Sequence, residues 1–210
     1  MRIPSVSRRQ FLATGSAAIA ATYIPDWSEA FQAGTTDDAR RAEAAEAALA
    51  RAAALGAAYA DIRVSRYRRE SIATRERQVQ SVSRSASFGM GLRVLLNGTW
   101  GFASINRVDP AAAREIADQA IAIARANALL TTRKVVLANA DKVIASWSNP
   151  ITRDPFAVPL ETKTAFLMKL NDTAMGVTGV SFVNSQLQFV DEQKYFASSE
   201  GSRITQRLVR

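Results

Sequence analysis

The sequence contains no cysteine and no histidine among its 210 residues. Their absence excludes disulfides, zinc sites built on Cys and His ligands, Cys–His nucleophile pairs and the Ser-His-Asp triad. A metal held by these residues alone would need carboxylate ligands, which favour magnesium or calcium. The lack of cysteine is compatible with an oxidising compartment but does not require one.

The charge is unbalanced, with few acidic residues for the number of basic ones. The formal net charge is +8, and it stays at +7 without residues 1–33, which hold three Arg and two acids. Such a surplus is compatible with a polyanion-binding surface. However, the basic residues are spread through all the predicted elements and form no dense cluster with aromatics. We therefore favour an arginine-biased composition on solvated faces, and no nucleic acid partner is expected.

The first 33 residues have the composition of an export signal. A charged start is followed by a modest apolar run over residues 17–24 and by a small-residue region that allows cleavage after Ala30 or Ala33. The run is too short for a membrane-spanning helix, which needs about 20 apolar residues. The paired arginines followed by Phe-Leu resemble a twin-arginine signal, whose key residues are Arg8, Arg9, Phe11 and Leu12.

The signal predicts export to the periplasm by the twin-arginine translocase, which carries folded proteins. Ala13 departs from the pattern, which often has Lys at this position. The alternative is an ordinary amphipathic N-terminal helix with a chance arginine pair. About half of the residues of the sequence are apolar. Residues 34–210, which follow the predicted signal, can therefore bury the core of one large domain.

Three Ala-rich or amphipathic segments predict helices. The first, Asp37–Leu55, ends before Gly56, and the second runs from an Asp109 cap and Pro110 to Asn127. The third is Leu160–Met175, and its expected core residues are Phe166, Leu167 and Leu170.

Residues 56–106 read as four strand-like runs joined by short turns. The clearest is the hairpin around Asn97-Gly98, a pair that favours a type I′ turn. An irregular spacing between Val79 and Val82 predicts a β-bulge. Gly89, Gly91 and Gly101 leave the sheet surface bare, which would suit close approach of a peptide or helix, although we favour simple sheet curvature.

The remaining sequence predicts an ordered connector over residues 128–159, a strand in 177–190, a turn at 199–202 and a strand in 204–209. Together these patterns predict an α+β fold in which an antiparallel sheet of hairpins packs with Ala-rich helices. The chain stops at Arg210 inside the last predicted strand, so we expect the sequence to be part of a longer protein.

Several segments between residues 40 and 210 together form a recognisable series. They are Ala-Asp-Ile-Arg-Val at 60–64, Gln-Ser-Val-Ser-Arg-Ser at 80–85, Gly-Met-Gly-Leu-Arg-Val at 89–94, Asn-Gly-Thr-Trp-Gly-Phe-Ala at 97–103, Ala-Ile-Ala-Arg-Ala at 122–126, Asp-Pro-Phe at 154–156 and Ser-Ser-Glu-Gly-Ser at 198–202. In order and spacing, these segments resemble the N-terminal domain of the TldD/PmbA family, also called modulators of DNA gyrase.

The resemblance implies a metallopeptidase that cuts peptides or unfolded segments. Its zinc is expected in a C-terminal part beyond this sequence, on a His-Glu-x-x-x-His motif and a later cysteine, with the Glu as general base. None of those residues occurs here, so no catalytic, metal or cofactor residue is assigned. The family also contains a partner subunit without the metal motif, which forms heterodimers with the active one.

Two functions therefore remain open at this point. Residues 34–210 are either the non-catalytic N-terminal domain of an exported peptidase, contributing substrate chamber and dimer contacts, or a non-enzymatic partner or interaction domain. A peptide could bind to either by adding a strand to a sheet edge. A carboxylate-only site using Asp61, Glu70 or Glu200 is a third possibility, but we expect these acids to be solvated strand and turn charges.

Overall fold

The computed structural model describes residues 34–210. The predicted export-signal residues Arg8, Arg9, Phe11 and Leu12 lie outside the described residues. Contacts divide the chain into a unit ending at Ala39 and a unit of Arg40–Arg210, and the packing described below is that of the second unit. None of the described helices has the length and hydrophobicity that crossing a lipid bilayer requires.

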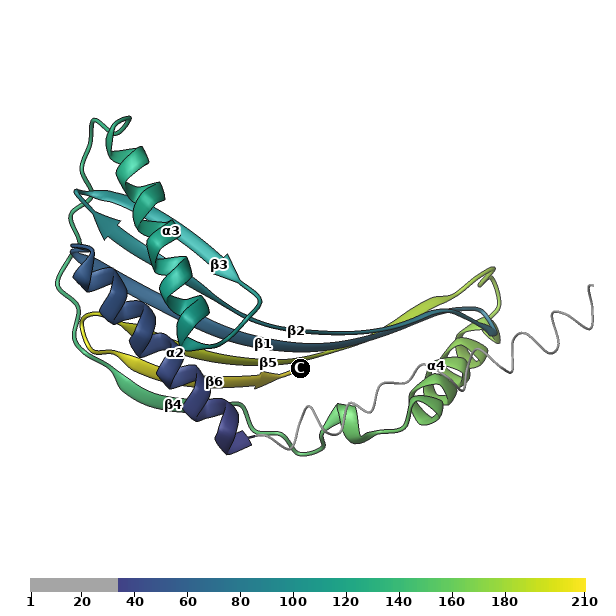
Figure 1. Cartoon of the computed structure of the whole chain (residues 1–210). Helices are drawn as coiled ribbons and strands as arrows, with labels where there is room; N and C mark the ends of the chain where they lie inside the picture. Colours follow the sequence, from purple (N-terminus) through teal and green to yellow (C-terminus); the bar gives the residue numbers. More distant parts are fainter. Residues whose placement is uncertain (1–33) are drawn as a thin grey trace, which may run out of the picture. The chain divides into compact units, whose positions relative to one another are not determined.

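The described elements are helices on one face of a sheet and the strands that form it (Figure 1). In chain order they are α2 (Gly34–Ala54), β1 (Tyr59–Arg75), β2 (Gln78–Leu96), β3 (Thr99–Ile105), α3 (Pro110–Ala128), β4 (Ile144–Ser148), the single 3-10 turn η2 (Pro155–Ala157), α4 (Leu160–Met175), β5 (Asn184–Ser198) and β6 (Arg203–Val209). The three predicted helices are therefore confirmed.

The strands form one sheet in the order β3-β2-β1-β5-β6-β4. All neighbouring pairs are antiparallel except β4 and β6, which are parallel. The α+β fold is thus confirmed, whereas β4 was expected to be part of a connector. Every residue of β4 is exposed, so this strand has no buried face and leaves no alternating pattern in the sequence.

The expectation of four short strands in residues 56–106 is wrong, because β1 and β2 are each one long strand. Polar residues occupy the middle of both strands, and this interrupts the hydrophobic alternation without interrupting the backbone pairing. The bulge is confirmed, since Ala73 pairs with Ser81 but Thr74 pairs with Val79. The type I′ turn is also supported, because Asn97 and Gly98 both have positive φ.

The main core lies between the β1–β3 end of the sheet and helices α2 and α3 (Figure 1). Ile62, Leu92 and Ile116 are fully buried there. Gly101 allows α3 to lie directly on β3, since a Cβ at this position would fall 1.9 Å from the carbonyl oxygen of Ala120. Close approach of a helix, rather than sheet curvature, explains this glycine.

Helix α4 packs near the far ends of β1 and β5, on the same face of the sheet as α2 and α3. The position of α4 on this face follows from the alternation of side chains along β1. Ile62, which belongs to the main core, and Thr74, which faces α4, both occupy even-numbered positions and therefore point to the same side of the sheet. The helix buries Leu167 as predicted, but Phe166 and Leu170 are 57% and 46% exposed.

The prediction that Phe166 and Leu170 are core residues is therefore wrong. The other buried residues of α4 are Lys163 and Asn171, which meet Glu70 and Thr74 of β1. A polar contact surface of this kind cannot be recognised from a hydrophobic pattern.

Candidate functional site

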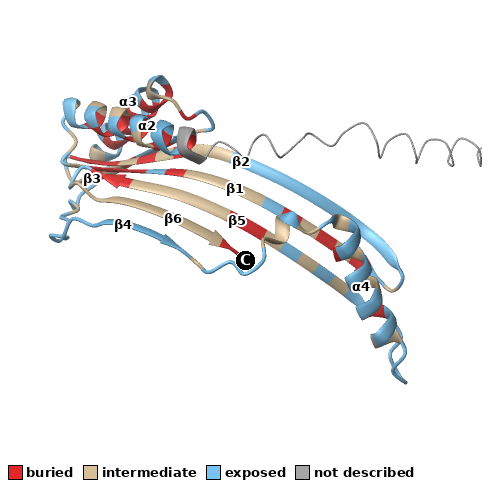
Figure 2. Ribbon diagram, turned by 90° about the horizontal axis from the view of Figure 1, so that it is seen from below, coloured by how far each residue is buried: buried red, intermediate tan, exposed pale blue. Residues whose placement is uncertain are grey.

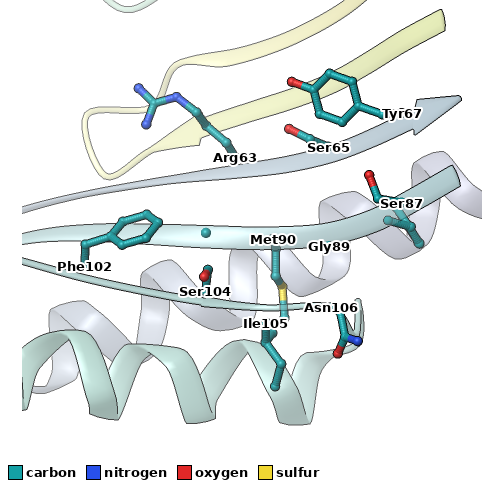
Figure 3. A pocket seen from close by; sticks show the side chains of 12 residues that line it. Arg63, Ser65, Tyr67, Ser87, Gly89, Met90, Phe102, Ser104, Ile105 and Asn106 are labelled. Atoms are coloured by element: carbon teal, nitrogen blue, oxygen red, sulfur yellow. The ribbon is translucent and has the colours of Figure 1, made fainter. Parts of the chain in front are cut away.

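One concave site formed by the described residues is a hollow of about 640 Å³ on the sheet face opposite α2 and α3 (Figure 3). Alternation along β1 turns Arg63, Ser65 and Tyr67 towards it, and the strand register places small residues of β2 beside them. The complete lining is Arg63, Ser65, Tyr67, Ser87, Phe88, Gly89, Met90, Gly91, Phe102, Ser104, Ile105 and Asn106.

Two glycines of β2 form the floor of the hollow. A Cβ on Gly91 would lie 3.0 Å from the ring of Phe102, so this ring rests against a strand position without a side chain. Phe102 is 56% exposed and forms an apolar wall. A Cβ on Gly89 would lie 2.7 Å from the carbonyl oxygen of Ile105. The hollow therefore exposes backbone beside an aromatic ring.

The charges that border the hollow are paired with one another. Arg63 donates a hydrogen bond of 2.7 Å to Asp61, and its guanidinium lies 5.3 Å from the ring centre of Phe196. The Tyr67 hydroxyl donates a hydrogen bond of 3.0 Å to Glu192, which also pairs with Lys194. The site therefore offers polar groups beside charges that have partners, with a local excess of arginine, because Asp61 also pairs with Arg93 and Arg69 lies 4.4 Å from the ring centre of Tyr67.

Burial and the neighbouring carboxylate of Glu192 raise the pKa of the Tyr67 hydroxyl. The hydrogen bond from Lys194 lowers the pKa of Glu192, against the opposing effect of burial. At neutral pH Tyr67 is therefore a protonated donor and Glu192 a charged acceptor, which fixes the direction of their hydrogen bond.

The hollow lies where the neighbour of β2 ends. Strand β3 pairs with Met90–Leu96 only, so the outer edge of Gln78–Phe88 continues beyond it. Among the described residues, no backbone hydrogen bond from another segment reaches this edge on the side away from β1. Residues 78–87 are exposed, as the pale blue part of β2 in Figure 2 shows.

The carboxylates considered from the sequence do not form a site together. Asp61 is fully buried and receives hydrogen bonds from Arg93 of 2.7 and 2.9 Å, in addition to the one from Arg63. Glu70 is 3% exposed and pairs with Arg84 at 2.6 Å and with Lys163. The expectation of solvated charges is therefore wrong for both acids, whereas Glu200 is exposed as expected.

In the part of the chain that the structure describes, no group of three or more acidic residues could hold a metal ion. The whole sequence also lacks His and Cys. The residues of this chain therefore do not fit a zinc centre of the type that the family resemblance implies.

The sequence interpretation identified the glycines but missed the hollow itself. The hollow could have been predicted from the two-residue turn at Asn97-Gly98, because this turn fixes the register of β2 and β3. That register alone places Phe102 opposite Arg93, and hence diagonally beside Gly91.

Fold and site define an α+β domain whose three described helices lie on one face of a mostly antiparallel sheet, while the other face carries an open hollow. The same class of fold occurs in two solved structures, which the chain matches with a TM-score of 0.63. One is TldE from Thermococcus kodakarensis, at 14% identity over 79% of this chain and 37% of that one. The other is a Bacteroides thetaiotaomicron protein named as a modulator of DNA gyrase, at 16% identity over 80% of this chain and 38% of that one.

The chain is related to the TldD/PmbA metalloprotease-like proteins. Residues 60–124 match the family model described as PmbA/TldA metallopeptidase domain 1. A metalloprotease of Synechocystis is 32% identical over 151 residues, which cover 70% of this chain and 31% of the relative. The chain thus spans about a third of the length of the curated relatives that it matches.

Proposed function

We propose that residues 34–210 are the N-terminal, non-catalytic part of an exported TldD/PmbA-like metallopeptidase that acts on peptides or unfolded segments. The observation that carries this proposal is the relationship to metalloproteases of which the chain spans about a third, without any His or Cys of its own. Zinc would then be bound by residues outside this chain, and the chemistry supplied there would be activation of a water molecule.

In this proposal the sheet contributes to the substrate chamber and to dimer contacts. The open face and the free edge of β2 support such a role, since both present polar groups and backbone that another segment could meet.

The signal residues Arg8 and Arg9 support export to the periplasm. Exchanging both for Lys is expected to retain the protein in the cytoplasm, which fractionation of the cells would measure.

The test begins with the coding sequence beyond Arg210. A His-Glu-x-x-x-His motif followed by a cysteine is expected there, and the longer product should contain zinc and cut an unfolded protein such as labelled casein. A chelator should abolish cleavage and added zinc should restore it. Residues 34–210 purified alone serve as the control and should cut nothing.

The alternative is a non-enzymatic partner subunit or interaction domain of the same family. The likeness to a protein named TldE supports keeping this alternative. A longer product without the metal motif, without zinc and without cleavage of casein would decide for the partner subunit. Co-purification with a family member that carries the motif would then identify the active chain.

A further inference from the structure

Apart from the bulge at residues 79–81, the edge of β2 lacks the features that usually prevent one sheet from adding to another. Natural edge strands are commonly protected by charges, proline or a covering segment. The segment Gln78–Phe88 contains no proline, and its single charged residue, Arg84, is held by Glu70 at 2.6 Å. Between the bulge and Phe88, its side chains on the open face are serines, at positions 81, 83, 85 and 87. This edge therefore presents backbone N–H and C=O groups next to small neutral side chains.

The edge and the hollow meet at the end of β3. A strand added along Gln78–Phe88 would continue the line of β3 beyond Ile105, because both would pair with the same side of β2. One of its side chains on the open face would then lie above Ser87 and Gly89, which line the hollow. The backbone edge and the hollow are thus adjacent, since Ser87 belongs to both.

The lining of the hollow indicates which side chain it accepts. Phe102 offers an exposed aromatic ring, and Ser65, Ser87 and Ser104 offer hydroxyl groups that can donate or accept hydrogen bonds. An aromatic side chain with a polar tip, Tyr or Trp, can contact the ring and bond to a hydroxyl at the same time. Arg63 and Glu192 already have partners of opposite charge within the chain, so neither needs a charged side chain from a ligand.

We propose that an extended peptide segment pairs with the edge Gln78–Phe88 of β2 and inserts one Tyr or Trp side chain into the hollow. Main-chain hydrogen bonds supply affinity that depends little on sequence, and the hollow supplies selectivity for the anchor residue. This inference rests on the proposed function in peptide handling and assigns it a particular edge and anchor class.

A second copy of this chain fits the site less well than a peptide does. If two copies paired through the same edge, each would offer the other its own residues 78–88. The only aromatic residue of that segment is Phe88, whose ring meets the guanidinium groups of Arg41 and Arg66. Arg66 occupies an even-numbered position of β1, so Phe88 faces the helical side and cannot serve as the anchor.

The first experiment measures binding of the whole 210-residue chain to a fluorescein-labelled nonapeptide of alternating Thr and Val with a central Tyr. Ser87→Trp fills the hollow with an indole of the chain itself and should raise the Kd tenfold or more. Ser146→Trp is the matched control, because it adds the same side chain to an exposed serine on the opposite edge strand, β4. It should change the Kd less than twofold.

Changes in the peptide test the two parts of the site separately. Replacing the central Tyr of the peptide by Ala should raise the Kd for the unchanged chain about as much as Ser87→Trp does. The same peptide change should raise the Kd of the Ser87→Trp variant little further. Methylating alternate backbone nitrogens on the pairing side should abolish binding. Hydrogen exchange by NMR should show that the peptide protects alternate amides of residues 80–88 and none in β4.

Equal Kd values for Ser87→Trp, Ser146→Trp and the unchanged chain would overturn the inference but leave the proposed function intact, because the peptide would then bind elsewhere. Peptide-independent dimerisation through residues 80–88, seen by sedimentation and amide protection, would assign the edge to a second copy and also overturn it. Absence of binding by the unchanged chain would overturn it as well. The proposed function itself stands or falls on zinc content and casein cleavage by the longer product.

Discussion

Asp61 is a buried acid whose two arginine partners remain partly in water. Its carboxylate is fully buried, whereas the side chains of Arg63 and Arg93 are 46% and 41% exposed. Removing the acid leaves two arginines that water can solvate, but removing both arginines leaves a buried charge without those partners. Removing both arginines is therefore expected to lower the free energy of unfolding more than removing the acid does.

Asp61→Asn should therefore lower the free energy of unfolding by about 1–3 kcal/mol. The double variant Arg63→Gln, Arg93→Gln should lower it by ~3–5 kcal/mol. Urea unfolding of the three proteins gives the comparison directly. The reverse order of the two losses would show that the arginines, and not the buried acid, determine the cost.

Glu192 gives the open face a dependence on pH. The hydrogen bond from Lys194 lowers the pKa of this carboxylate below its ordinary value of 4.5. A lowered pKa in the folded state means that the interaction stabilises the fold above pH 4.5, and that this stabilisation is lost as the pH falls below that value.

Glu192→Gln should consequently destabilise the protein most at neutral pH. Its unfolding free energy should approach that of the unchanged protein as the solution is acidified through and below pH 4.5. Unfolding curves over this pH range test the prediction, and a constant difference between the two proteins would contradict it. Gln188→Ala, on the same strand, is the control, because it changes a residue that does not titrate.

At the residue scale, the sequence predicts the caps and turns well because they depend on local chemistry. Asp109 accepts a hydrogen bond of 2.8 Å from the N–H of Ala112, as its position before Pro110 indicates. The burial of Asp61 and Glu70 could not be predicted in this way. Their partners lie 2 to 93 positions away along the chain, and only the strand register and the docking of α4 bring them together.

Gly101 is an example at the element scale, since it sets the distance between α3 and β3. A Cβ there would meet the Ala120 carbonyl oxygen at 1.9 Å and the Ala124 nitrogen at 2.7 Å, so the whole helix would have to move. Gly101→Ala should lower the unfolding free energy by ~3 kcal/mol, the upper part of the range for an overpacked core.

Gly176→Ala is the matched control for this prediction. Gly176 has a φ of −72°, and a Cβ there would lie 3.4 Å from the nearest atom, the Thr173 carbonyl oxygen. The change should alter the unfolding free energy by less than ~0.5 kcal/mol. Similar losses at both glycines, measured by urea unfolding, would show that the contact with α3 does not decide the effect.

The boundaries of an element were predictable where residues that begin or end a helix flank it, as Pro159 and Gly176 do. The helix Leu160–Met175 was predicted with the boundaries that the structure gives it. The side of this helix that faces the sheet was not, because Lys163 and Asn171 are buried through polar partners in β1 while Phe166 and Leu170 point outward. The hydrophobic rule therefore selected the wrong face.

At the scale of the whole molecule, many of the arginines lie in local ion pairs, and the net positive charge that remains is spread over the sequence. Ten arginines of the described residues form ion pairs with acids, namely Arg51, Arg63, Arg68, Arg75, Arg77, Arg84, Arg93, Arg107, Arg203 and Arg207. This distribution supports the interpretation that the arginines belong to solvated and partly buried pairs rather than to one polyanion-binding surface.

We expect the chain to bind heparin or duplex DNA only at low ionic strength and without sequence preference. Binding should weaken steeply with salt and be lost near physiological concentrations, because it depends on general charge alone. Fluorescence anisotropy with two unrelated DNA duplexes over a salt series measures this. Tight binding of one duplex at physiological salt would contradict it.

The arrangement of the core along the chain has a consequence for the order of folding. All buried residues of the main core except Ala197 lie between Ala44 and Ala124. The β1–β2 hairpin closes through a two-residue turn, whereas β5 pairs with β1 from more than a hundred positions away, as Arg75 opposite Asn184 shows. Local pairings form quickly, and distant ones carry a larger entropic cost of loop closure. The first half of the protein should therefore gain its structure while the ribosome is still producing the second, and the joining of β5 should limit the rate of completion.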